Sequence, residues 1–288
     1  MSSLPKKLLR TVWAALLAFL ILGIGQGIWG ALFVGNIRST PSFPWAVPAM
    51  AVVLWFMWQY LGGRWWPHAT SEKRRNLLRA NRVPGEVLGW ALLAGLLAIV
   101  ALAGYWIVLS QLVRTPPNAL ADFSQYPALT AVLAIGMASL VSPVTEEAAF
   151  RGYCQVILEQ EFAPPVAVLI SSFFFCLAHL TQGFFWPKLL VYFLVGILFG
   201  VTAYLTQSSL PALPVHIVGD LTFFLLVWPR DATRALFRAG GGANDWFWIH
   251  LGQAILFTAL SVSAFLRLKR VVRIRASVDE KPRHNQCG

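Results

Sequence analysis

The sequence SPVTEEAAFRG, residues 142–152, places two adjacent carboxylates, Glu146 and Glu147, and one guanidinium, Arg151, inside a long apolar run. A charged side chain at membrane depth costs free energy, so such residues are by default candidates for a functional site. The chain has only 12 Asp and Glu residues, and two of them stand side by side here. The stretch therefore predicts a polar site within an apolar helix bundle.

The composition around this stretch is that of an integral membrane protein. Hydrophobic residues make up 57% of the chain, charged residues 12%, and the mean hydropathy is +0.64. Soluble domains carry about 25% charged residues. The net charge of +11 is explained by the Lys and Arg that collect in cytoplasmic loops. No nucleic-acid motif is present, so we expect the bilayer, and not a nucleic acid, as a partner.

The apolar segments predict an all-α fold, a polytopic membrane helix bundle with about eight transmembrane helices. A span needs about 20 apolar residues, and eight segments are candidates. They lie at about 11–35, 44–62, 87–113, from 127 into the Glu146–Glu147 pair, 164–183, 187–206, 210–228 and 246–267. We expect the ionisable residues among them to line a polar cavity that opens toward the cytoplasmic side.

Basic residues predict the orientation and a division into three parts. Most of the 23 Lys and Arg residues lie in the first ten residues, in the loop 64–82 and in the tail after the last span. The positive-inside rule then places both termini in the cytoplasm, and we expect a bacterial cytoplasmic membrane. The parts are a three-span region at 1–126 with a basic cytoplasmic loop at 64–86, a core at 127–229, and a last span with a basic tail at 230–288.

The break at Pro164-Pro165 predicts a helical hairpin that brings two of the ionisable residues to one depth. Proline disfavours helix in the residue before it, so the fourth span should run on as helix to a turn near Ala163. Glu146 precedes that position by about 17 residues and His179 follows it by about 16, which at 1.5 Å per residue is about 25 Å along each helix. We therefore expect Glu146 and His179 to face each other across the hairpin.

Helical spacing assigns different roles to the two glutamates. Glu147 and Arg151 are four positions apart, so they share a helix face and can pair. Glu146 is rotated by about 100° from Glu147 at 3.6 residues per turn. We interpret Glu147 and Arg151 as a structural ion pair and Glu146 as the chemical group.

Three further residues on later spans complete the candidate site. Phe175 stands four positions before His179, where it can support the imidazole. His216 and Asp220 are also four apart and share one face. A lone histidine in an apolar span is most often a core residue with a satisfied hydrogen bond, but four ionisable groups at similar depth imply a hydrated cavity.

Such a set suits the activation of water. A carboxylate can take a proton from water while an imidazole orients it, and a second polar pair can stabilise an oxyanion. The alternative is a divalent metal such as zinc, whose ligands would be Glu146, His179, His216 and Asp220. The H-E-x-x-H pattern of zinc proteases is absent. The sequence identifies no cofactor with certainty, and a divalent metal such as zinc stays the alternative.

In these residues the chain resembles the CAAX protease and bacteriocin-processing (CPBP, or Abi) family of intramembrane endopeptidases. That family is marked by E-E-x-x-x-R, F-x-x-x-H and H-x-x-x-N or D on successive helices. The chain has Glu146-Glu147-Ala148-Ala149-Phe150-Arg151, Phe175-Cys176-Leu177-Ala178-His179 and His216-Ile217-Val218-Gly219-Asp220. The match covers roughly residues 127–229.

The resemblance implies a glutamate-dependent protease that cleaves a membrane-associated protein or peptide. Carried over by motif, Glu146 is the general base, His179 helps to bind and polarise the water, and His216 with residue 220 stabilises the oxyanion. Members that cleave prenylated proteins have asparagine at this last position, whereas this chain has Asp220. An ionised carboxylate cannot donate to an oxyanion, so the departure puts a prenylated substrate in doubt.

Two other classes of function remain open from the sequence. One is a non-catalytic membrane immunity or scaffold protein of the same family, which keeps the motifs for structure. The other is a transporter or proton relay, because buried acids and histidines also serve there. Transporters are typically built from repeated halves, and the sequence shows no internal repeat.

Overall fold

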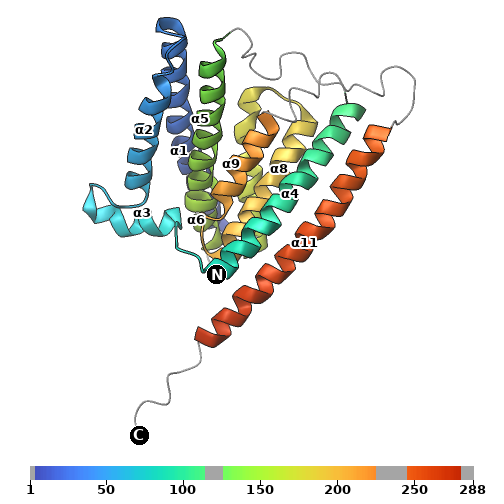
Figure 1. The fold of residues 1–288 in the computed structure, drawn as a ribbon. Helices are drawn as coiled ribbons and strands as arrows, with labels where there is room; N and C mark the ends of the chain where they lie inside the picture. Colours follow the sequence, from blue (N-terminus) through green and yellow to red (C-terminus); the bar gives the residue numbers. More distant parts are fainter. Residues whose placement is uncertain (1–3, 114–125, 225–244, 280–288) are drawn as a thin grey trace.

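A computed structural model describes residues 4–113, 126–224 and 245–279, and within these ranges the chain is helical and contains no strand (Figure 1). The predicted all-α fold class is therefore confirmed. The longer helices are α1 (Leu4–Ser39), α2 (Ala46–Leu61), α4 (Gly85–Leu112), α5 (Ala128–Glu146), α7 (Pro164–Ala178), α8 (Trp186–Thr206), α9 (Ala212–Thr222) and α11 (Asp245–Asp279). Shorter elements are η1 (His68–Thr70), α3 (Ser71–Leu78), the π-helix η2 (Glu147–Cys154), α6 (Gln155–Glu159) and the 3₁₀ turn η3 (His179–Gln182).

Six helical segments in the described ranges are long and apolar enough to cross a membrane. They are α1, α4, the continuous run Ala128–Glu159, Pro164–Thr181, α8 and Asp245–Ser277. The predicted number was about eight. The two further candidates correspond to α2, a shorter apolar helix of 16 residues, and to α9, which has 11 residues. The end of the predicted span 210–228 lies outside the described residues.

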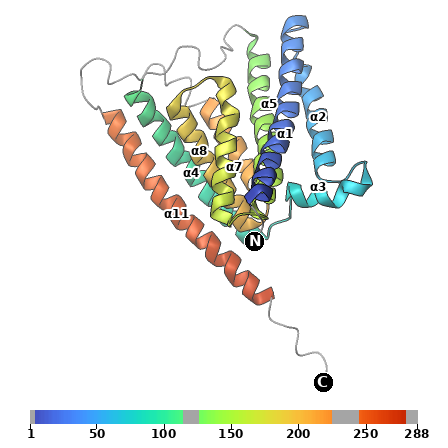
Figure 2. The ribbon, with the colours of Figure 1, turned by 180° about the vertical axis from the view of Figure 1, so that it is seen from behind.

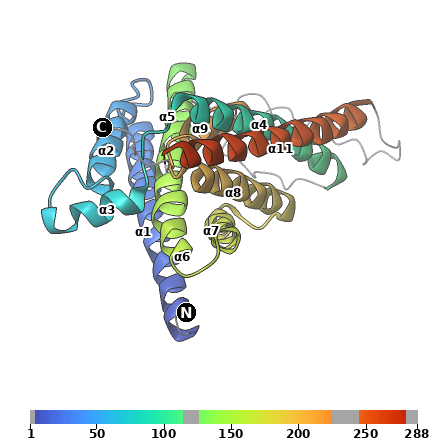
Figure 3. The same cartoon turned by 90° about the horizontal axis from the view of Figure 1, so that it is seen from below.

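The helices alternate in direction, so that several connections gather at one end of the bundle. The start of α1, the element α3, the turn between α6 and α7 and the end of α11 lie at that end (Figures 1 and 2). The view from below shows α3 across this end, beside α1 (Figure 3). These are the segments that the positive-inside rule places in the cytoplasm. Which end faces the cytoplasm stays a prediction.

The helical hairpin expected around Pro164 is present. Helix continues from Ala128 through Glu159, and α7 begins at Pro164, where the missing N–H of proline has no helical partner to lose. Ion pairs join the residues before this turn to other parts of the bundle. Arg79 pairs with Glu159, and Arg10 lies 3.2 Å from Glu161.

The π-helix η2 is the most deeply buried element, and all eight of its residues are buried. It packs against α1, α3, α7 and α8. Ser171 donates a hydrogen bond to the Phe150 carbonyl at 2.8 Å. A Cβ on Gly152 would lie 3.0 Å from the Leu77 carbonyl oxygen, so glycine is what lets the end of α3 reach this helix. Helices outside the predicted core at 127–229 therefore pack directly on it.

Close packing of α7 on α8 predicts a stability defect for Gly196→Ala. A Cβ at residue 196 would lie 2.8 Å from Ser172 Cβ and 2.9 Å from Ser172 Cα. Overpacking of this kind costs about 1–3 kcal/mol, so we expect a lower thermal midpoint for the purified protein. The matched control is Gly136→Ala, whose Cβ meets nothing within 4 Å. Equal midpoints for the two variants would contradict the packing described here.

Candidate active site

The first carboxylate, Glu146, closes α5 at the point where the α-helix passes into the π-helix. Its side chain is 5% exposed. Ser142 lies one turn earlier, and its hydroxyl donates to Glu146 Oε1 at 2.5 Å. The contact follows from i, i+4 spacing. It holds one oxygen of the Glu146 carboxylate in place within the bundle.

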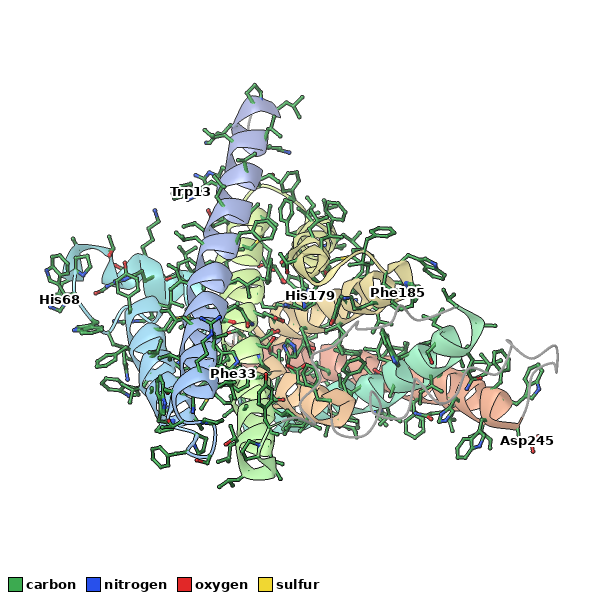
Figure 4. All side chains as sticks on the ribbon, turned by 90° about the horizontal axis from the view of Figure 1, so that it is seen from above. Trp13, Phe33, His68, His179, Phe185 and Asp245 are labelled. Carbon is green, nitrogen blue, oxygen red and sulfur yellow. The ribbon has the colours of Figure 1, made fainter. Side chains whose placement is uncertain are left out.

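His179 lies within the bundle (Figure 4), just beyond the last residue of α7. Its Nδ1 donates to the Phe175 carbonyl oxygen at 2.8 Å, so in the neutral ring Nε2 carries the lone pair. Nε2 is 3.9 Å from Glu146 Oε1, which is too long for a direct hydrogen bond. The ring of Tyr192 stacks on the imidazole with centroids 3.8 Å apart.

His216, on α9, lies between three carboxylates. Its Nδ1 donates to Glu147 Oε1 at 3.0 Å. Its Nε2 is 3.6 Å from Glu146 Oε2 and 3.7 Å from Asp220 Oδ1. Phe199 stacks on the ring at a centroid distance of 4.6 Å. His216 is therefore the side chain that links all of the acidic residues of the site.

The predicted pair of Glu147 and Arg151 is present in a fully buried environment. Arg151 Nη1 lies 3.4 Å from Glu147 Oε1, and the two side chains are 1% and 0% exposed. The guanidinium lies 4.2 Å from the ring centre of Phe175, where cation–π attraction is favourable. Because the same Glu147 oxygen also accepts from His216, this carboxylate does more than neutralise Arg151.

A pocket of about 120 Å³ opens onto these side chains. One water needs about 10–15 Å³, so the pocket has room for several. Its walls come from α4, α5, α7, α8 and α9 and from residues 223–224, and most of the lining surface is apolar. The lining includes Glu146, His179, His216 and Asp220. The four residues singled out from the sequence thus share one cavity. Their roles stay predictions, as does an opening toward the cytoplasm.

Zinc binding by these residues stays a prediction. Among residues 4–113, 126–224 and 245–279, no three His, Cys, Asp or Glu side chains are grouped as metal ligands. His216 Nε2 stays 3.6–3.7 Å from the two nearest carboxylate oxygens, and its Nδ1 is engaged by Glu147.

Sequence reasoning missed several side chains of the pocket. Ser142 could have been found, because it stands four residues before Glu146 within the same motif. Tyr192, Phe199 and Lys188 belong to α8, which carries no recognisable motif. Only the packing of α8 across the hairpin brings these three to the histidines.

Comparison with protein families gives one match. Residues 128–222 match the family model described as type II CAAX prenyl endopeptidase, Rce1-like. This range contains every residue of the three motifs. No curated protein and no solved structure was found to match the chain.

Proposed function

Because residues 128–222 form an Rce1-like domain of the CPBP family, we propose that this integral membrane protein is an intramembrane endopeptidase. Its substrate is a membrane-associated protein or peptide. The observation that carries the proposal is the convergence of Glu146, His179 and His216 on one pocket, with Asp220 beside them. Family membership supports protease chemistry. The geometry of the pocket supports the proposal that this protein retains that chemistry.

Glu146 and His179 are arranged to activate water. Two acceptors, Glu146 Oε1 and the lone pair of His179 Nε2, stand 3.9 Å apart, so one water can donate a hydrogen to each. As the water oxygen bonds to the carbonyl carbon of the peptide, its proton passes to Glu146. When the tetrahedral intermediate collapses, the carbon–nitrogen bond breaks and Glu146 returns that proton to the leaving amine.

His216 supplies the donor for the oxyanion in this scheme. Its Nδ1 is fixed by Glu147, so Nε2 points into the pocket. A doubly protonated ring donates from Nε2 to the oxygen of the attacked carbonyl. Asp220, 3.7 Å from Nε2, balances the charge of the imidazolium. A carboxylate at residue 220 is then compatible with catalysis although it donates no hydrogen bond itself.

Asp220→Asn and Asp220→Leu should separate these contributions. The carboxamide of asparagine supplies a donor to the oxyanion, so we expect kcat/KM to stay within about tenfold of the wild type. Leucine offers no polar atom, and we expect a loss of about 100-fold or more, the scale seen when an oxyanion contact is removed. An equal loss in both variants would mean that catalysis requires the negative charge of the carboxylate beside His216.

The overall proposal is tested by mass spectrometry of protein termini in membranes of the source organism. Cells lacking the gene are compared with cells complemented by the wild type or by Glu146→Gln. We expect unprocessed termini in the deletion strain, rescued only by the wild type. If Glu146→Gln also restores processing, the protein is a non-catalytic member of the family.

Alkaline phosphatase fusions to each end would test the expected cytoplasmic termini.

A further inference from the structure

The surface segment at residues 64–76 takes no part in the proposed chemistry and carries both exposed tryptophans and exposed basic side chains. It follows α2, passes through η1 and ends within α3. The helix α3 lies across the end of the bundle, whereas α2 runs along the bundle (Figures 1 and 3). His68, in η1, lies at the outer edge of the molecule (Figure 4). Because the apolar helix α2 ends at Leu61, the surface segment lies beside the bundle at the depth where lipid headgroups begin.

The aromatic side chains of the surface segment are arranged as at a membrane interface. Trp65 and Trp66 are 49% and 74% exposed. The ring of Trp65 stacks on Phe56 of α2 with centroids 5.0 Å apart, and Phe56 is itself exposed on that apolar helix. The stack turns the indole of Trp65 back along the outer face of α2. Tryptophan is enriched at the boundary between acyl chains and headgroups, so these side chains place the segment at that boundary.

A buried arginine holds the surface segment in one conformation. Arg74 of α3 is 6% exposed, and its guanidinium donates to the carbonyl oxygens of Trp65 and Pro67, the latter at 3.0 Å. The guanidinium also lies 4.3 Å from the ring centre of Tyr60. Five N–H donors in a fixed plane allow one arginine to bind several acceptors. The conformation is thus set before a ligand binds, which lowers the entropic cost of binding.

Exposed positive charge lies beside the tryptophans. Lys73 and Arg75 are exposed, and at 3.6 residues per turn they project about 100° to either side of the buried Arg74. Arg64, which precedes the first tryptophan, is exposed as well, and Glu72 is the one acid of the surface segment. A basic segment next to a membrane span attracts anionic lipids, and each Lys or Arg contributes to the attraction.

We propose that the surface segment binds the headgroups of anionic phospholipids, with Lys73 and Arg75 at the phosphates and Trp65 and Trp66 at the acyl-chain boundary. The exposed indoles favour a lipid over an acidic protein or a nucleic acid, because only the lipid offers an apolar phase next to its charge. The inference does not depend on the proposed protease function. Since α3 packs on the π-helix η2, we also expect bound lipid to raise the thermal midpoint of the protein.

The test measures lipid binding by the purified full-length protein in a neutral detergent. Phosphatidylglycerol or phosphatidylcholine is titrated into the protein, and bound lipid is counted by native mass spectrometry. The wild type is compared with Lys73→Gln/Arg75→Gln. The matched control is Lys269→Gln/Arg270→Gln, which removes two exposed positive charges from the C-terminal part of α11. Thermal midpoints without added lipid show whether each variant is folded. Glycerol 3-phosphate and oligoglutamate are added as soluble competitors.

We expect the wild type to bind phosphatidylglycerol more tightly than phosphatidylcholine. Lys73→Gln/Arg75→Gln should weaken phosphatidylglycerol binding about 30-fold, since each basic residue near an anionic surface contributes about fivefold. The control should match the wild type, and neither competitor should displace the lipid.

Three outcomes would overturn the inference. Equal binding of the two lipids by the wild type would show that the charge of the headgroup is not recognised, whatever the variants do. An equal loss in the α11 control would show that any basic residue of the protein serves as well. Displacement by glycerol 3-phosphate or by oligoglutamate would identify the surface segment as a site for a soluble phosphate or an acidic protein.

Discussion

Replacing Glu146 with Gln is expected to lower kcat by about 100- to 10,000-fold, the contribution typical of a general base. Glutamine has nearly the same shape, and it can still accept the hydrogen bond that Ser142 donates to residue 146 at 2.5 Å in the wild type. It cannot take a proton from water. The measurement is cleavage, by purified protein in liposomes, of a substrate identified from the comparison of termini.

Two controls make the result specific to this carboxylate. Glu72→Gln makes the same change on the exposed surface of α3 and should leave kcat unchanged. The thermal midpoint of Glu146→Gln should stay close to that of the wild type, because Arg151 and His216 Nδ1 both keep Glu147 as their nearest carboxylate. A Glu146→Gln protein that cleaves at the wild-type rate would rule out the mechanism proposed above.

Replacing Glu147 with Gln is expected to reduce the amount of folded protein sharply. The guanidinium of Arg151 is 1% exposed and lies 3.4 Å from Glu147 Oε1. Removing one partner of a buried ion pair typically costs about 3–5 kcal/mol, since the remaining charge is left unpaired. Solubilised protein that elutes as a single folded species, normalised to expression, is the readout.

The double variant Glu147→Gln/Arg151→Met separates stability from catalysis. It removes both charges and keeps a long side chain beside Phe175 and Phe199, so most of the folded protein should return. Cleavage should nevertheless stay at least about 100-fold below the wild type, because His216 Nδ1 then donates to a neutral amide oxygen, which stabilises the doubly protonated ring less than the carboxylate does. Wild-type cleavage by the double variant would show that Glu147 serves the fold alone.

Much of this arrangement was accessible from the sequence because it depends on helix length and spacing. The break at Pro164 fixed the hairpin, and counting residues from it put Glu146 and His179 at one depth. The i, i+4 spacing placed Glu147 beside Arg151. These predictions need only the rise of an α-helix and the rule that proline begins a helix more easily than it continues one.

The part that the sequence did not reveal depends on how other helices meet the motif. The glutamates were assigned to separate faces on α-helical geometry, yet His216 reaches both, through Nδ1 to Glu147 and Nε2 toward Glu146. Residues 147–154 form a π-helix, and no pattern of apolar residues distinguishes it from an α-helix. The stacking of Tyr192 and Phe199 on the histidines likewise requires the position of α8.

One wall of the pocket has a consequence for how substrate preference can diverge. Ile99, Leu102, Ala103 and Trp106 belong to α4, which precedes the family-matched range of 128–222. The candidate catalytic residues and this wall thus lie on separate stretches of the chain. If the proposed function holds, we expect an exchange of α4 between homologues to change substrate preference while it leaves the candidate catalytic residues in place, so that preference becomes an engineerable property.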